Sequence, residues 1–175
     1  LMRQLLLDLL PASPPSLDNF VPGGNGETLA ALTAWLAGAG GETSFCLWGE
    51  AGPGCSHLLT ASGFAYVDAA ADPGLGGAEA AEALAVDHVE ALDSEGQIAL
   101  FNRFNRLKAS GGRLLTAAPQ PPAHLVLRED LRTTLVRIQN ELFDVGADLC
   151  LPLRETYDYP PLRVQQPWID DLEAD

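Results

Sequence analysis

Apolar residues recur along the chain either as short continuous runs or at helical spacing. The continuous runs predict buried strands at 44–49, 63–69, 84–87 and 113–118. Helical spacing predicts helices over 27–40 and 94–112, the second beginning at a capping-like Ser94 and both ending in glycine. Strands that alternate with a glycine-rich loop and with helices predict an α/β fold, in which a parallel sheet is covered by helices on both faces.

The last part of the chain has a different pattern. Its apolar residues follow helical spacing at Ile138, Leu142, Val145 and Leu149. Prolines interrupt the remainder, where we expect at most a short helix after Pro167. The pattern therefore predicts an α/β domain at 26–134 followed by a helical segment at 135–175.

Composition and charge narrow the class of protein. The chain has 175 residues, a formal net charge of −14 and three cysteines, which lack the spacing of a zinc site. An acidic surface repels a phosphate backbone, which argues against direct binding of nucleic acid. No apolar run approaches the roughly 18 residues of a membrane span, and Asp8 interrupts the leucine-rich start, unlike a secretory signal. We expect a soluble protein of the reducing cytoplasm that does not enter membranes.

A glycine-rich stretch follows the first predicted strand directly. Residues 49–56 read GEAGPGCS, which fits the phosphate-binding pattern G-x-x-x-x-G-K-S except that Cys55 stands where lysine belongs. Glycines let backbone N–H groups turn toward a phosphate, and the Ser56 hydroxyl is the expected ligand of Mg²⁺. The candidate nucleotide-binding residues, for ADP or ATP with Mg²⁺, are Gly49, Gly52, Gly54, Cys55, Ser56 and His57. An ordinary glycine-rich turn from strand to helix is the alternative.

An acid ends a later apolar strand. Asp87 closes the run at 84–87, as does the Mg²⁺-associated aspartate of a phosphate-binding loop protein, and it is the second candidate metal ligand. His88 follows, where an ATPase usually has an acid that positions water. We treat His88 as a candidate catalytic residue and, equally, as a partly exposed loop residue.

Several motifs together resemble one family. The stretches QLLLDL, PSLDNFVPG, LWGEAGPGCSHLL, VDHVEALDSEGQIALFNRFN and LREDLRT occur in the order seen in Hda proteins. These are DnaA-related AAA+ proteins that inactivate the bacterial replication initiator. The resemblance covers about residues 2–134 and implies a P-loop NTPase fold, the AAA+ base.

The resemblance also implies a role for the leucine-rich start. Hda proteins carry an N-terminal peptide that binds the DNA polymerase sliding clamp, and the matching residues are Gln4, Leu5, Leu7 and Leu9. An extended peptide places alternate side chains in an apolar groove of its partner. We expect a clamp-binding peptide at 1–10 and a tether at 11–25 that docks at Phe20, unless the peptide packs on its own domain. The implied partners are the sliding clamp, the β subunit of DNA polymerase III, and DnaA. A homo-oligomer is a further expectation, since AAA+ sites commonly lie between subunits.

At two positions the chain lacks a residue that ATP hydrolysis in this family requires. The position of Cys55 is normally basic, and Thr134 replaces the arginine finger of the LR-x-x-LRTR stretch. Arg132 lies two residues earlier, where a helix would aim it elsewhere. An arginine finger accelerates hydrolysis by orders of magnitude, so we do not expect a competent ATPase from this chain alone.

The resemblance to Hda stops after Thr134. Residues 137–152, RIQNELFDVGADLCLP, instead resemble a stretch inside the PduO-type ATP:cob(I)alamin adenosyltransferases, which are helical bundles. The nucleotide-binding parts of that family have no counterpart here. We therefore expect a chimeric or truncated chain, without the last strand and the lid of the AAA+ fold, in which a helix at 136–151 covers the edge of the first strand. A stand-alone AAA+ nucleotide hydrolase and an adenosyltransferase fragment are the alternative functions.

Overall fold

The computed structural model describes residues 13–49, 54–132 and 149–152. Within these ranges the helices are α1 (Gly26–Leu36), α2 (Cys55–Ala61) and α3 (Ser94–Ser110). The strands are β1 (Ser44–Trp48), β2 (Ala65–Asp68), β3 (Ala83–Asp87), β4 (Arg113–Ala118) and β5 (Leu149–Pro152). Short 3₁₀ turns, η1 to η3, lie at Gly23–Asn25, Val89–Ala91 and Pro122–His124. None of the helices in these ranges has the length and apolarity that a bilayer crossing requires.

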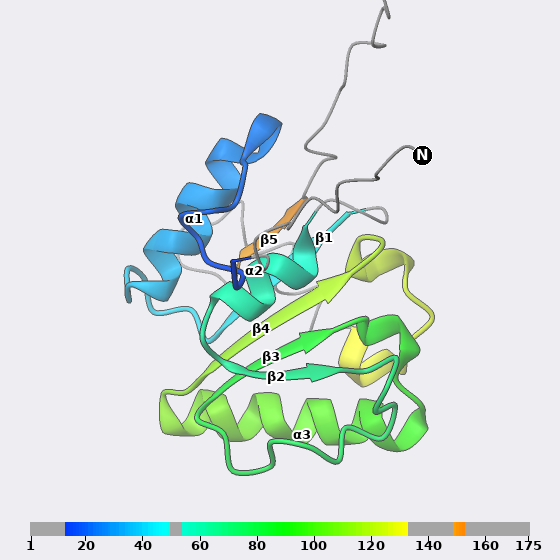
Figure 1. The fold of residues 1–175 in the computed structure, drawn as a ribbon. Helices are drawn as coiled ribbons and strands as arrows, with labels where there is room; N and C mark the ends of the chain where they lie inside the picture. Colours follow the sequence, from blue (N-terminus) through cyan, green and yellow to red (C-terminus); the bar gives the residue numbers. More distant parts are fainter. Residues whose placement is uncertain (1–12, 50–53, 133–148, 153–175) are drawn as a thin grey trace, which may run out of the picture.

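The five strands form one parallel sheet in the order β2-β3-β4-β1-β5. Helices α1 and α2 lie on one face of the sheet and α3 on the other (Figure 1). The predicted α/β class, with a parallel sheet between flanking helices, is confirmed. Because the strands are parallel, the segments that follow β1, β2 and β3 all emerge at the same edge.

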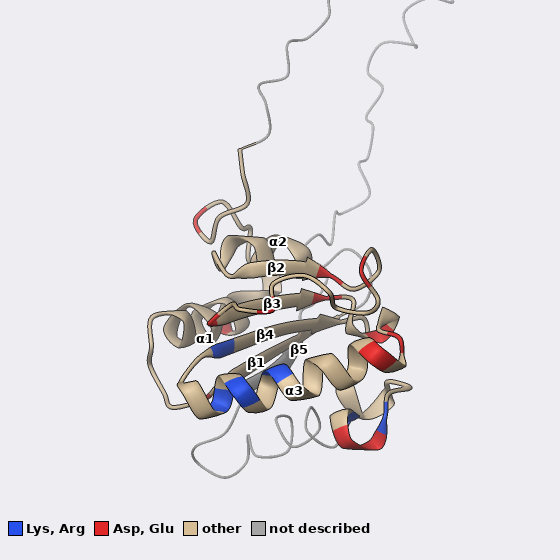
Figure 2. Ribbon diagram, turned by 90° about the horizontal axis from the view of Figure 1, so that it is seen from below, with Lys and Arg blue, Asp and Glu red and all other residues tan. Residues whose placement is uncertain are grey.

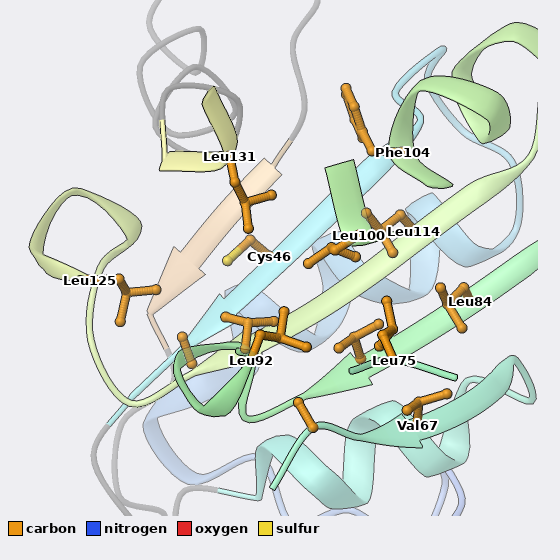
Figure 3. Close-up of a cluster of buried hydrophobic side chains, with 14 of the residues drawn as sticks. Cys46, Val67, Leu75, Leu84, Leu92, Leu100, Phe104, Leu114, Leu125 and Leu131 are labelled. Carbon is orange, nitrogen blue, oxygen red and sulfur yellow. The ribbon is translucent and has the colours of Figure 1, made fainter. Parts of the chain in front are cut away.

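Successive side chains of a strand point to opposite faces of the sheet, so a separate apolar cluster lies on each face. Leu84 and Val86 of β3 pack with Leu100 of α3, whereas Ala85 between them packs with α1 and α2. Figure 3 shows Leu84, Leu100 and Leu114 in the cluster on the α3 face. On the other face, Trp35 of α1 contacts Phe45 of β1 with ring centroids 5.4 Å apart. Both faces are therefore covered by apolar side chains, as the continuous apolar runs predict.

The N-cap of helix α3 lies one residue earlier than predicted. Asp93, not Ser94, is the N-cap, and its carboxylate accepts a hydrogen bond from the Gly96 N–H at 2.8 Å. The helix ends at Gly111, whose φ of +73° suits glycine. Its acidic start and basic end, visible in Figure 2, match the helix dipole.

The expectation of a missing last strand is wrong. Strand β5 pairs in parallel with β1, and Phe45, Cys46, Leu47 and Trp48 lie opposite residues 149–152. Leu149, predicted as the end of a helix, therefore belongs to a strand, while residues 133–148 of that prediction lie outside the described residues. The open N–H and C=O groups of β1 explain the difference, because a short apolar run satisfies them by pairing. Strand β5, rather than a helix at 136–151, covers this edge.

Candidate functional site

The candidate residues gather at the carboxyl edge of the sheet. The loop 49–56 follows β1, while Asp68 and Asp87 end the neighbouring strands β2 and β3 in register with each other. Figure 2 shows the acidic ends of these two strands side by side. Ligands of open α/β sheets bind at this edge, so the predicted residues on β1, α2 and β3 are brought to a position suited to binding.

Gly54 forms the turn from the loop into α2. Its φ is +92°, and a Cβ at this position would stand 2.6 Å from the Phe20 ring. Both the backbone conformation and the close ring therefore require glycine here. The start of the loop is fixed as well, because the Gly49 N–H donates to the Ala118 carbonyl of β4 at 3.1 Å. Gly52 lies outside the described residues.

The segment before α1 packs against the start of α2. Phe20 is buried, which confirms that the segment docks there, and its ring lies 5.5 Å from the His57 ring. The His57 Nε2 donates to the Ser16 carbonyl at 2.8 Å. The sequence offered no partner for His57, because this contact joins residues that are 41 positions apart.

Cys55 gives the loop a neutral side chain where a phosphate-binding loop has a cation. Burial, followed by the charge of Asp87, raises the pKa of the Cys55 thiol to about 12. The thiol therefore stays protonated at neutral pH and is neither a cation nor a nucleophile. Ser56, the next residue, is exposed at the start of α2.

Asp87 is buried, and each of its two carboxylate oxygens accepts a hydrogen bond. Its Oδ2 accepts from the Tyr66 hydroxyl and its Oδ1 from the His88 N–H, each at 3.0 Å. Burial and the nearby Asp87 carboxylate raise the pKa of Tyr66, so the phenol stays a donor. Sequence analysis missed Tyr66, although the alternation of β2 and the Asp68–Asp87 register place it on the same face as Asp87.

The His88 ring lies next to the carboxylates of Asp68 and Asp87. It has φ +51° and ψ +50°, and its Nδ1 lies 2.9 Å from Asp68 Oδ1 and 3.9 Å from Asp87 Oδ1. Burial opposes the charged imidazole, but the hydrogen bond to Asp68 and the charges of Asp87 and Glu90 outweigh it and raise the pKa of His88. The same hydrogen bond lowers the pKa of Asp68. His88 thus lies at the site and is 46% exposed, as the loop alternative expected, with a carboxylate as its partner.

The described residues near Asp87 do not form a cluster of metal-ligating side chains. Both carboxylate oxygens of Asp87 already accept hydrogen bonds, and the described ranges hold no group of three His, Cys, Asp or Glu side chains placed for a metal. Magnesium at Ser56 and Asp87 stays a prediction.

Other predicted residues lie away from this arrangement or outside the described ranges. Arg132 forms an ion pair with Glu129. Thr134, and the clamp-peptide residues Gln4, Leu5, Leu7 and Leu9, fall outside the described residues.

The chain is similar to several solved structures. The AMPPCP-bound DnaA of Aquifex aeolicus superposes with a TM-score of 0.63 at 21% identity, over 85% of this chain and 53% of that one. Protein NMB1076 of Neisseria meningitidis is 38% identical, over 77% of this chain and 94% of that one, with a TM-score of 0.46. The chain thus spans about half the length of the DnaA structure.

A second similarity lies toward the end of the chain. A family model described as cobalamin adenosyltransferase matches residues 90–175, which include α3, β4 and β5. A corrinoid adenosyltransferase of Mycobacterium bovis is 56% identical over 40 residues, which make up 23% of this chain and 21% of that protein. The chain covers about a fifth of this relative.

The chain is thus similar to two different kinds of protein, one in its fold and one in the sequence of its later part. The described residues have the α/β fold of the DnaA structures, and a segment of the same chain is similar to cobalamin adenosyltransferases.

Proposed function

We propose that this chain is a nucleotide-binding regulator of the Hda type, which binds ADP or ATP at residues 49–56 and hydrolyses it poorly. The main observation is the left-handed turn at Gly54 between β1 and α2, which packs against Phe20, with Asp87 close enough to raise the pKa of the Cys55 thiol. The DnaA structure of the same fold contains AMPPCP, which supports a nucleotide as the ligand of this loop.

The chain's own residues account for binding with weak hydrolysis. Backbone N–H groups at a strand-to-helix turn donate to a phosphate whatever the side chains are. Cys55 supplies no positive charge, so the affinity is expected to be lower than in a loop with lysine. The arginine finger that Thr134 replaces would act on a nucleotide held by a neighbouring subunit, so in an assembly of such chains the charge developing on the phosphate is not compensated.

A lysine at position 55 is expected to strengthen the binding of ADP. Cys55→Lys should tighten ADP binding by roughly 10- to 100-fold, the contribution of one charge-assisted hydrogen bond. Isothermal titration calorimetry with ADP measures the change. Cys55→Met is the matched control, because it adds length without charge. Equal affinities of the lysine and methionine variants would contradict a phosphate beside residue 55.

Binding of the sliding clamp is the second proposed activity, carried by the peptide at residues 1–10. Replacing both Gln4 and Leu7 by alanine removes the polar anchor and one apolar anchor. We expect at least a tenfold loss of affinity for the bacterial clamp in surface plasmon resonance. Asp8→Asn is the matched control, since it changes the peptide without touching the pattern Q-L-x-L-x-L. Clamp binding that survives the double replacement would overturn the assignment, as would no binding by the parent chain.

The family match at 90–175 favours adenosyl transfer to a corrinoid as a second candidate function. A spectral titration with cobalamin tests it, and a saturable shift of the corrinoid bands would support it.

DnaA partnership is tested by the rate of ATP hydrolysis by DnaA in the presence of the chain and the clamp. We expect at most weak stimulation, because Thr134 replaces the finger.

A further inference from the structure

Two of the three cysteines of the chain occupy paired positions in neighbouring strands. In the parallel register of β1 and β5, Cys46 lies opposite Cys150. Cys150 falls in the range matched by the cobalamin adenosyltransferase model, whereas Cys46 lies well before that range. The fold therefore brings together two cysteines that are far apart in the chain and that no local sequence pattern pairs.

The spacing of the two strands suits a covalent bond between these positions. Neighbouring strands of a sheet lie about 4.8 Å apart, and residues paired across them belong to the same face of the sheet. Disulfides join residues whose Cα atoms are about 4.4–6.8 Å apart. The backbone of β1 and β5 therefore holds Cys46 and Cys150 within the range in which a disulfide forms.

Cys46 is buried on the face of the sheet that α3 covers. It is 1% exposed, and Figure 3 shows it in the same cluster as Leu114 and Leu131. Cys55, in contrast, packs against the cluster on the other face. The sheet thus lies between Cys46 and Cys55, and Cys150 is the cysteine whose position allows a bond to Cys46 within one face.

The position of β5 at the edge of the sheet controls access to Cys46. Among the described strands β5 has one neighbour, β1, and the two share four paired positions (Figure 1). A short edge ladder opens at a lower free energy than strands in the middle of a sheet. Separation of β5 from β1 uncovers one side of Cys46, and a bond formed after the strands pair again prevents the next separation.

We propose that Cys46 and Cys150 form a redox-active thiol pair, which a small disulfide such as oxidised glutathione converts to a covalent link between β1 and β5. One cysteine, as the thiolate, attacks the oxidant, forms a mixed disulfide and releases one glutathione thiol. The second cysteine then displaces the other glutathione. The two hydrogens and two electrons of the cysteines pass to glutathione, and the open edge of β1 is closed. The bond requires no nucleotide, so this modification site is independent of the proposed function.

Equilibration of the whole chain with reduced and oxidised glutathione tests the pairing. In the Cys55→Ser variant, the cross-linked fraction gives the effective concentration of one remaining thiol at the other. We expect this value to be at least about tenfold higher in native buffer than in concentrated urea, where only the connecting chain brings the two thiols together. The parent chain, oxidised in native buffer, should yield a linked Cys46–Cys150 peptide in mass spectrometry.

Thermal melting shows whether the bond fixes the strand. Oxidation of the Cys55→Ser variant should raise its Tm by at least about 5 °C, because a cross-link restricts the unfolded chain, and dithiothreitol should reverse the rise. Cys55→Ser combined with Cys150→Ser is the matched control, and its Tm should not change on oxidation. A native effective concentration less than about tenfold above the urea value, a parent bond that includes Cys55, or a Tm that oxidation leaves unchanged would overturn the proposal.

Discussion

A chain that ends after Thr134 is expected to self-associate and to melt at a lower temperature than a chain that ends after Pro152. Removing residues 135–175 takes away β5 and leaves β1 as an edge with the sequence Ser-Phe-Cys-Leu-Trp. An apolar edge strand with open N–H and C=O groups pairs readily with another copy. Loss of the hydrogen bonds between β5 and β1 should lower the free energy of unfolding by about 2–4 kcal/mol, at roughly 1 kcal/mol for each hydrogen bond. This corresponds to a fall in Tm of at least about 5 °C.

Size-exclusion chromatography with light scattering and thermal melting measure the two effects. The chain that ends after Pro152 is the matched control, since it keeps β5 and differs from the shorter chain only in residues 135–152. If both chains gave the same mass and the same Tm, β5 would contribute nothing to the sheet.

Gly96→Ala is expected to destabilise the protein by about 2–4 kcal/mol. A Cβ on Gly96 would stand 1.9 Å from the Pro73 carbonyl oxygen, a backbone atom that cannot rotate away. This oxygen also accepts a hydrogen bond from the Asp93 N–H at 3.1 Å, and the nearby Leu75 is buried in the core. The loop before β3 would therefore have to leave the start of α3. Urea denaturation followed by circular dichroism measures the loss.

Gly26→Ala serves as the matched control for that substitution. Gly26 is also at the start of a helix, but a Cβ there meets no atom within 4 Å. Alanine should stabilise α1 there by about 0.5–1 kcal/mol. Two losses of similar size would mean that the close contact with Pro73 is not what makes Gly96 necessary.

Much of the fold could be predicted from local patterns. The continuous apolar runs gave β1 to β4, because strands buried on both faces carry apolar residues on both. The helical stripe through Leu32 and Trp35 gave α1. Strand β5 was missed because a three-residue apolar run reads equally well as the end of a helix, and only the open edge of β1 decides between the two.

The candidate site was predictable only where it is contiguous. The glycines, Cys55 and Ser56 follow one strand, and Asp87 ends another, so position along the chain was sufficient to find them. The hydrogen-bond partners of these residues could not be found in this way. Tyr66 lies 21 positions from Asp87 in the sequence, and Ser16 lies 41 positions from His57. Such contacts depend on strand register and on packing of the first segment, which no local pattern contains.

The central claim is that nucleotide binds at residues 49–56. Titration of the ¹⁵N-labelled chain with ADP, followed by amide chemical shifts, tests it most directly. The account predicts saturable shifts concentrated at Gly49, Gly54, Cys55 and Ser56, with smaller ones at Asp87 and His88. Shifts confined to other parts of the chain, or none at ADP concentrations about 100-fold above those that saturate the Cys55→Lys variant, would contradict it.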